Sequence, residues 1–283
     1  MALSALLASL GPGGRDFERL CKWLLENVPE YGSKLTQVWL WDDWPARRGR
    51  DMGIDLVAQD REGGLWAIQA KHYDPAYSIK KADLDSFLSA SSRAEFSYRL
   101  LIATTDHLGQ NARSTLAIQE KPVGALLRSQ LDVLQVAWPN SLTSLSPAIV
   151  ERKRPRPHQL VAIQECIAGL ASAERGQLVM ACGTGKTLIG AFLAERMEAR
   201  SVLVLVPSLS LLGQTLRGWT TATEFQYLAV CSDETVTKSE QDAVVASTSE
   251  LGIPVTTDAA HVARFLDRPS NDAMKVVFST YQS

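Results

Sequence analysis

A glycine-rich loop at residues 180–187 constrains the fold of this chain more than any other feature of its sequence. The loop reads Met-Ala-Cys-Gly-Thr-Gly-Lys-Thr, between an apolar run at 177–181 and a helical pattern at 186–199. A strand, a glycine loop and a helix in this order turn backbone N–H groups toward phosphate oxygens. Met180 stands where the pattern GxxxxGK[ST] has its first glycine, so we identify a variant of this loop rather than a chance glycine turn.

The side chains of the loop predict ATP binding with Mg2+. Lys186 is placed to reach the outer phosphates and the Thr187 hydroxyl to hold the metal ion, while the following helix adds positive potential. We therefore predict a cofactor site for ATP and Mg2+, with Thr187 as a metal ligand, at Gly183, Thr184, Gly185, Lys186 and Thr187.

The rest of the second half alternates helical and strand patterns. Around the predicted strand 177–181 and helix 186–199, we predict helices at 158–171 and 209–219, strands at 202–206 and 274–280, and irregular chain at 233–257. Strands that alternate with helices form a parallel sheet. The second half is therefore predicted to be an α/β domain.

The first half has a different order of elements. Several of its short runs are rich in β-branched and aromatic residues, and Arg-Glu-Gly-Gly at 61–64 supplies a turn between two of them. We predict strands at 36–41, 54–59, 65–71, 98–104 and 131–136, and helices at 17–28, 79–92 and 110–119. These elements predict an α/β domain around a mixed sheet that contains a β-hairpin.

Three side chains suited to phosphodiester hydrolysis gather at this hairpin in the pattern D-x13-Q-x-K: Asp55, Gln69 and Lys71. Strand alternation puts Gln69 and Lys71 on one face, and the turn brings Asp55 to within about 5 Å of them. Oxygen ligands fix Mg2+ against a scissile phosphate, and a cation stabilises developing charge. We predict Asp55 and Gln69 as metal ligands and Lys71 as the catalytic cation, with a structural ion pair as the alternative.

Length and composition bound the organisation of the chain. Its 283 residues suit about two domains, and a Ser- and Pro-rich stretch with a basic run separates them, so we predict domains at 1–138 and 158–283 and a linker at 139–157. Four cysteines without a CxxC pair, no signal peptide and no membrane-length apolar stretch predict a cytoplasmic protein without membrane contact. The formal charge of -2 gives no global basic field, so contacts with DNA depend on local patches.

Two further groups of residues leave alternatives open. Trp39, Trp41 and Trp44 either stack on DNA bases or pack a core, and tryptophans at alternate strand positions usually pack a core. The run Arg-Arg-Gly-Arg at 47–50 either contacts phosphates or is a solvated loop.

The second half resembles superfamily 2 helicases and the motor subunits of restriction enzymes. The resemblance rests on the loop at 180–187, on Arg-Pro-Arg-Pro-His-Gln at 154–159 and on the strand that ends at Pro207. It implies a partial RecA-like parallel α/β domain in which Gln159 reads the adenine; a surface position on a helix is the alternative for Gln159. No acidic metal motif, second lobe or arginine finger occurs before Ser283, so we expect an incomplete motor, either as a fragment of a longer protein or as a truncated reading frame.

The first half resembles the Mrr branch of PD-(D/E)xK nucleases, in which Gln replaces the usual Glu. The residues that carry the resemblance are Gly-Ile-Asp-Leu-Val-Ala at 53–58, Trp-Ala-Ile-Gln-Ala-Lys at 66–71 and Leu-Ile-Ala-Thr-Thr-Asp at 101–106. It implies an Mrr-like restriction-endonuclease fold, a mixed sheet flanked by helices, with Mg2+ at the site. It also implies a supporting role in metal binding for Glu18 on the first helix, for which an exposed helix charge is the alternative.

The order of nuclease, linker and motor resembles the front of single-chain type ISP restriction enzymes. This implies an ATP-dependent DNA endonuclease that translocates on double-stranded DNA, with methyltransferase and target-recognition modules as partners outside this chain. Two alternatives remain open: a stand-alone nuclease-helicase in DNA repair or phage defence, and a DNA-binding module without cleavage on a helicase.

Overall fold

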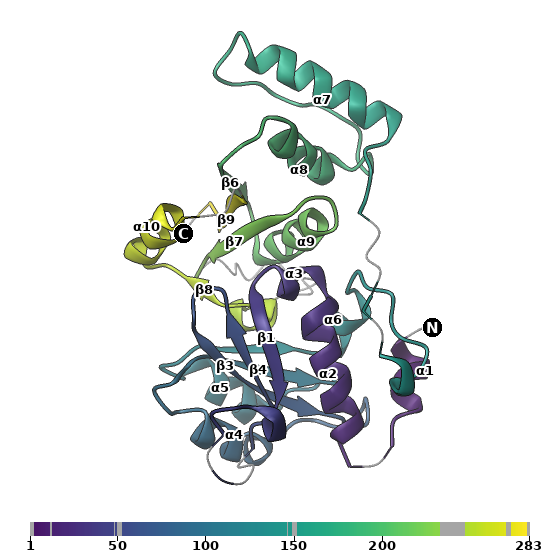
Figure 1. The fold of residues 1–283 in the computed structure, drawn as a ribbon, viewed down its shortest axis with the longest axis vertical. Helices are drawn as coiled ribbons and strands as arrows, with labels where there is room; N and C mark the ends of the chain where they lie inside the picture. Colours follow the sequence, from purple (N-terminus) through teal and green to yellow (C-terminus); the bar gives the residue numbers. More distant parts are fainter. Residues whose placement is uncertain are drawn as a thin grey trace. The chain divides into compact units, whose positions relative to one another are not determined.

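The chain forms two compact units, Met1–Ile149 with Val236–Val255, and Val150–Thr235 with Thr256–Ser283. The computed structural model describes residues 3–11, 13–47, 49, 53–145, 147–148, 152–232, 247–269 and 273–281. Each unit contains one β-sheet with helices packed on it (Figure 1). Within the described residues, no helix is long and apolar enough to cross a membrane.

The first unit is built on a five-stranded sheet in the order β1-β2-β3-β4-β5. The neighbours β1, β2 and β3 are antiparallel, whereas β4 and β5 are added in parallel. The mixed sheet and the β2–β3 hairpin confirm the predicted fold class. The strands are β1 (Leu35–Leu40), β2 (Leu56–Asp60), β3 (Leu65–Lys71), β4 (Phe96–Ala103) and β5 (Val123–Leu126).

Helices cover this sheet and bury its apolar side chains. The amphipathic helix α2 packs against β1 and β3, while α4 and α5 share a hydrophobic cluster with β2, β3, β4 and β5. The helices and 3-10 helices of the unit are α1 (Leu3–Ala8), α2 (Arg15–Asn27), α3 (Pro29–Gly32), η1 (Trp41–Asp43), η2 (Lys81–Asp83), α4 (Asp85–Ala90), α5 (Gln110–Ala117), α6 (Arg128–Asp132), η3 (Leu142–Ser144) and η5 (Thr248–Leu251).

The turn of the β2–β3 hairpin is held by one buried carboxylate. Asp60 accepts hydrogen bonds from the backbone N–H groups of Glu62 (2.9 Å) and Gly64 (2.8 Å) and from the indole N–H of Trp66 (3.0 Å). Gly63 has a φ of 83°, a conformation that favours glycine. These bonds fix the register of β3, and therefore the positions of Gln69 and Lys71 relative to β2.

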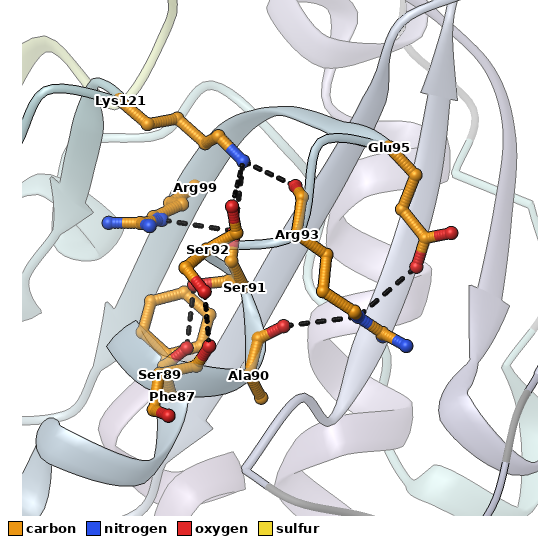
Figure 2. Close-up of polar contacts among 9 residues, drawn as sticks. All are labelled: Phe87, Ser89, Ala90, Ser91, Ser92, Arg93, Glu95, Arg99 and Lys121. Atoms are coloured by element: carbon orange, nitrogen blue, oxygen red, sulfur yellow. Dashed lines mark hydrogen bonds and ion pairs between the residues drawn. The ribbon is translucent and has the colours of Figure 1, made fainter.

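Three cations of the first unit serve the end of a helix rather than an open surface. Lys121 donates to the carbonyls of Ser91 (3.1 Å) and Ser92 (3.2 Å), and the buried Arg99 donates to that of Ser91, just past the C-terminus of α4 (Figure 2). Arg93 donates to the carbonyl of Ala90. Burial lowers the pKa of Arg99, and burial and the neighbouring Arg99 lower the pKa of Lys121. Cations at a helix C-terminus satisfy its unpaired carbonyls, so this cluster is structural.

Residues 247–255 pack on the first unit, although they lie between elements of the second in sequence. Leu251 and Ile253 are buried there, Tyr31 donates a hydrogen bond to the carbonyl of Gly252 (3.3 Å), and Arg113 pairs with Glu250 (2.8 Å). The sequence analysis predicted only irregular chain at 233–257. Of that stretch, residues 233–246 lie outside the described residues.

The second unit contains a four-stranded sheet in the order β6-β9-β7-β8, in which β9 pairs in parallel with both β6 and β7. All seven residues of β9 are buried; Trp219 of α9 contacts Phe278, and Phe265 of α10 clusters with Val277. The parallel α/β pattern confirms the prediction. The elements are α7 (Pro157–Leu170), α8 (Lys186–Arg196), β6 (Ser201–Val206), α9 (Leu209–Thr220), β7 (Phe225–Val230), β8 (Val255–Thr256), α10 (Ala259–Asp267) and β9 (Met274–Thr280).

Two predicted elements of the first half are corrected. The fifth strand is β5, not 131–136, because Leu131 and Leu134 are buried three residues apart while Val133 is 48% exposed, a helical rather than an alternating pattern. The Gln130 side chain accepts a hydrogen bond from the N–H of Leu127 and so favours the turn into α6. The predicted helix at 79–92 is interrupted, and Ile79 instead forms a β-bridge with Leu108.

The predicted strand at 177–181 is also wrong. Leu178 and Val179 are 37% and 80% exposed, and no described strand pairs with this segment. Strand β6 lies at the edge of its sheet. One of its faces is also exposed, with Leu203 61% and Leu205 48% exposed. A β-strand needs a neighbouring strand for its backbone hydrogen bonds, so an apolar run without one stays irregular.

Candidate functional site

Asp55 lies just before β2, and its carboxylate is held against the backbone of β3. Its N–H donates to the carbonyl of Ile68 (2.9 Å), and its Oδ2 accepts from the N–H of Ala70 (2.7 Å). The carboxylate therefore lies beside the peptide that separates Gln69 from Lys71. The hairpin brings together the three residues of the D-x13-Q-x-K pattern.

Gln69 is 1% exposed, and its side-chain amide is held in one orientation. Its Nε2 donates to the carbonyl of Gly53 (3.1 Å). Because a carbonyl only accepts, Oε1 must face away from Gly53, and Oε1 has no hydrogen-bond partner among the described residues. A buried acceptor without a donor is costly, and a cation or a water molecule would satisfy it.

Gly53 is the residue that allows this arrangement. Its φ is 106°, and a Cβ there would lie 2.7 Å from Ser86 Oγ and 2.9 Å from the N atom of Phe87. Both the backbone conformation and the close approach to α4 therefore require glycine. The sequence analysis used Gly53 only as part of the family resemblance.

Lys71 ends β3 on the same face as Gln69. Its backbone carbonyl accepts a hydrogen bond from the N–H of Thr104 (3.1 Å), which ties this end of β3 to the end of β4. The side chain is half-buried, and within the described part of the chain its ammonium has neither an ion pair nor a hydrogen bond. A cation that has no partner among the described residues, on the same face of β3 as Gln69, suits an anionic ligand better than a structural ion pair.

Glu18 approaches the same region from helix α2. The ring of Phe17 stacks on that of His72, the residue after Lys71, with centroids 5.7 Å apart. Burial raises the pKa of the Cys21 thiol, and the nearby charges of Asp55 and Glu18 raise it further. Both carboxylates therefore lie close to one buried thiol. Cys21 escaped the sequence analysis, although its position one helical turn after Glu18 was a signal.

The donors in this region suit a hard divalent cation. Among the described residues, no group of three or more His, Cys, Asp or Glu side chains is arranged to hold a metal. The available donors are instead two carboxylates and one amide, Asp55, Glu18 and Gln69, all of which offer oxygen. Mg2+ prefers oxygen ligands. Among the described residues Gln69 Oε1 has no hydrogen-bond partner, so this oxygen is available to a metal ion.

The phosphate loop adopts the conformation that its glycines predict. Gly183 and Gly185 have φ values of 79° and 82°, and α8 begins directly after Gly185. Lys186 Nζ donates to the carbonyls of Met180 and Ala181, at 3.0 Å each, so the lysine is folded onto its own loop. The first N–H groups of α8 have no partner within the helix and face an anion-binding position.

Gln159 is 3% exposed and braces this loop, so its surface alternative is wrong. Its Oε1 accepts from the N–H of Arg156 (2.9 Å) and its Nε2 donates to the carbonyl of Thr184 (3.0 Å). A Cβ at Gly185 would lie 2.5 Å from this Nε2. The amide thus fixes the loop from α7, a role that the sequence did not reveal, and its reading of adenine stays a prediction.

The remaining candidates for DNA contact divide into structural and undescribed residues. Trp41 and Trp44 are 5% exposed within the core cluster, and Trp39 packs against it, so the three pack a core. Arg47 pairs with Asp42 at 2.6 Å on the surface. Arg48 and Arg50 lie outside the described residues.

Comparisons with known proteins agree with both halves of this arrangement. Residues 26–146 match a family of restriction endonucleases of the Mrr type, and residues 152–283 match the family of the res subunit of type III restriction enzymes. The fold, the hairpin site and the phosphate loop thus define a restriction nuclease domain joined to a helicase-type domain. The first family matches within the first unit, and the second family matches most of the second unit. Glu18 lies outside the first match.

Among solved structures, the chain is similar to the ATP-dependent type ISP restriction-modification enzyme LlaBIII bound to DNA. The two are 33% identical with a TM-score of 0.81, over 94% of this chain and 18% of that enzyme. The chain thus spans about a fifth of its length. A nuclease-deletion mutant of the type ISP enzyme LlaGI is 36% identical over 46% of this chain and 13% of its own, with a TM-score of 0.35. No curated protein matches the chain.

Proposed function

We propose that this chain forms the nuclease domain and the first motor lobe of an ATP-dependent DNA restriction endonuclease of the type ISP kind. The matched families generally use a divalent metal and ATP. The observation that carries the proposal is the interlocked hairpin, in which Asp55 is bonded to the backbone of β3 and Gln69 to Gly53. Double-stranded DNA is the proposed substrate, since LlaBIII is bound to DNA.

Each residue of the hairpin has a proposed role in cleavage. Asp55 and Gln69 hold Mg2+ through oxygen atoms, with support from Glu18, and the metal ion supplies an activated water and charge stabilisation when bound. Lys71 binds an oxygen of the scissile phosphate through its ammonium. The hydrogen bonds to Ala70 and Gly53 hold Asp55 and Gln69 in place before substrate arrives, so little ordering remains for the reaction.

The phosphate loop binds the triphosphate of ATP in this proposal. Lys186 exchanges its bonds to the carbonyls of Met180 and Ala181 for bonds to the outer phosphates, and Thr187 helps to hold Mg2+. Gly183, Thr184 and Gly185 shape the loop, and Gln159 holds it from α7. Hydrolysis then drives translocation on DNA in the complete enzyme, with methyltransferase and target-recognition modules as its partners.

The test is DNA cleavage by the complete enzyme with Mg2+, compared between wild type and Asp55→Ala. Loss of cleavage with unchanged DNA-stimulated ATP hydrolysis would support the proposal, because the two sites lie in separate units. A protein that binds DNA but leaves it intact with both Mg2+ and Mn2+ would instead be the non-cleaving module. LlaBIII favours the type ISP arrangement over a stand-alone nuclease-helicase.

A further inference from the structure

Tyr73 lies two residues after the end of β3, and the buried hydroxyl of Thr104 holds its backbone. The N–H of Tyr73 donates to Thr104 Oγ1 (2.8 Å), and the same oxygen donates to the carbonyl of Tyr73 (2.6 Å). Thr104 is 2% exposed, and its own N–H bonds to Lys71. Both the N–H and the carbonyl of Tyr73 are therefore bonded to the residue that follows β4.

The ring of Tyr73 packs against its neighbour Tyr77, but the two hydroxyls differ. The ring centroids are 4.4 Å apart, and both rings rest on the core cluster of the first unit. Tyr77 donates its hydroxyl to Asp83 (2.9 Å). The hydroxyl of Tyr73 has no hydrogen-bond partner among the described residues, and the side chain is only half-buried. Of this aromatic pair, Tyr73 is the one with a free donor.

The Tyr73 hydroxyl is close enough to the proposed nuclease site to be affected by the charge of Asp55. Tyr73 packs on the core cluster that contains Ala67, and Ala67 shares its face of β3 with Gln69 and Lys71 by strand alternation. Burial, followed by the charges of Asp83, Tyr77 and Asp55, raises the pKa of Tyr73 to about 12, so the hydroxyl keeps its proton at neutral pH. Within the described residues, Lys71 and Tyr73 thus offer two donors without partners from neighbouring positions at the end of β3.

We infer that the Tyr73 hydroxyl donates a hydrogen bond to a phosphate oxygen of DNA at the cleavage site, and so positions the backbone for Lys71 and the metal ligands. This inference rests on the proposed nuclease function. Tyr77 covers part of the Tyr73 ring, which favours contact through the hydroxyl over stacking on a base. A phosphate is the anionic group of the substrate that such a donor recognises without reading sequence.

The test compares Tyr73→Phe with the matched variant Tyr77→Phe in the complete enzyme, by single-turnover DNA cleavage and by ATP hydrolysis in the same samples. Each variant removes one oxygen from one of the two packed rings. A hydrogen bond to a charged group supports a loss of about 10- to 100-fold in the cleavage rate of Tyr73→Phe. Tyr77→Phe should stay within about threefold of wild type, and ATP hydrolysis should be unchanged in both.

Further variants separate the possible outcomes. Tyr73→His, which restores a ring N–H donor, should recover part of the rate that Tyr73→Phe loses. A cleavage rate of Tyr73→Phe equal to that of wild type would overturn the inference. An equal loss of cleavage rate in Tyr77→Phe would also overturn it. Cleavage by wild type but not by Asp55→Ala would show that the nuclease function still holds. Equal cleavage by wild type and Asp55→Ala would instead overturn the proposed function itself.

Discussion

The two sheets of this chain differ in how completely their strands are paired and their side chains buried. In the first, β2, β3 and β4 lie between other strands, and Leu56, Ile68 and Leu100 are fully buried. In the second, β6 is an edge strand, and Leu203 on one of its faces is 61% exposed. The proposed nuclease site therefore lies on a sheet whose central strands are fully buried, whereas the phosphate loop follows a segment that pairs with no described strand. A sequence can therefore predict a site motif correctly without predicting the strands that support it.

The largest expected effect breaks the second unit alone. Lys186→Ala should weaken triphosphate binding by at least about 30-fold, because removing one partner of a close charge pair costs about 2 to 5 kcal/mol. Isothermal titration calorimetry with a non-hydrolysable ATP analogue measures this affinity. The circular dichroism and the stability of the first unit should not change. Equal affinity in wild type and variant would contradict the assignment of the loop.

Matched leucine truncations sharpen the contrast between the two sheets. Leu100→Ala in β4 should lower the free energy of unfolding of the first unit by about 2 to 5 kcal/mol, because it leaves a cavity in a closed core. Leu203→Ala in β6 should change stability by no more than about 0.5 kcal/mol, since that side chain is already exposed. Urea unfolding followed by fluorescence measures both. Similar losses of unfolding free energy would show that the face of β6 that carries Leu203 is covered in solution.

A smaller effect tests how the hairpin turn sets the site. Asp60→Ala removes the acceptor of three hydrogen bonds, to Glu62, Gly64 and Trp66. Leaving buried donors unpaired should cost about 1 to 3 kcal/mol and reduce DNA cleavage by the complete enzyme, with ATP hydrolysis unchanged. Thermal unfolding and a plasmid nicking assay check the two effects. Reduced stability with full cleavage would show that the turn does not control the register of Gln69 and Lys71.

The smallest expected effect is a pH dependence confined to the first unit. Burial lowers the pKa of His72 below its usual 6.5, so the unfolded chain binds this proton more readily than the folded chain. The resulting stability is present above about pH 6.5 and is lost as pH falls through the folded-state pKa. The thermal midpoint of wild type should therefore drop more between pH 7.5 and 5.5 than that of His72→Phe. An equal drop would contradict a half-buried His72 that stays neutral in the folded chain.

The sequence predicted local arrangements well and distant ones poorly. The hairpin that joins Asp55 to Lys71 and the glycine conformations around Lys186 follow from short-range spacing and turn chemistry. The strand at 177–181 failed because pairing depends on a neighbour that no local pattern reveals. Alternation between Leu131 and Val136 suggested a strand where the buried side chains recur at helical spacing.

Contacts between distant segments explain what the sequence could not show of the sites. The bond from Gln159 to Thr184 and the stack of Phe17 on His72 each join residues far apart in the chain. The placement of Glu18 near Asp55 depends on how α2 packs against β3, and the packing of residues 247–255 on the first unit depends on tertiary structure alone. Residue identity suggested the chemistry, and packing decided which groups meet.

The central claim is that each unit carries its own site, one for cutting DNA and one for ATP. The most direct test measures plasmid cleavage and phosphate release together, with Mg2+, on the complete enzyme and on Lys71→Ala. The account predicts that Lys71→Ala hydrolyses ATP at the wild-type rate in the presence of DNA and leaves the plasmid intact, because it removes only the proposed catalytic cation of the first unit. Unimpaired cleavage by Lys71→Ala would contradict the account.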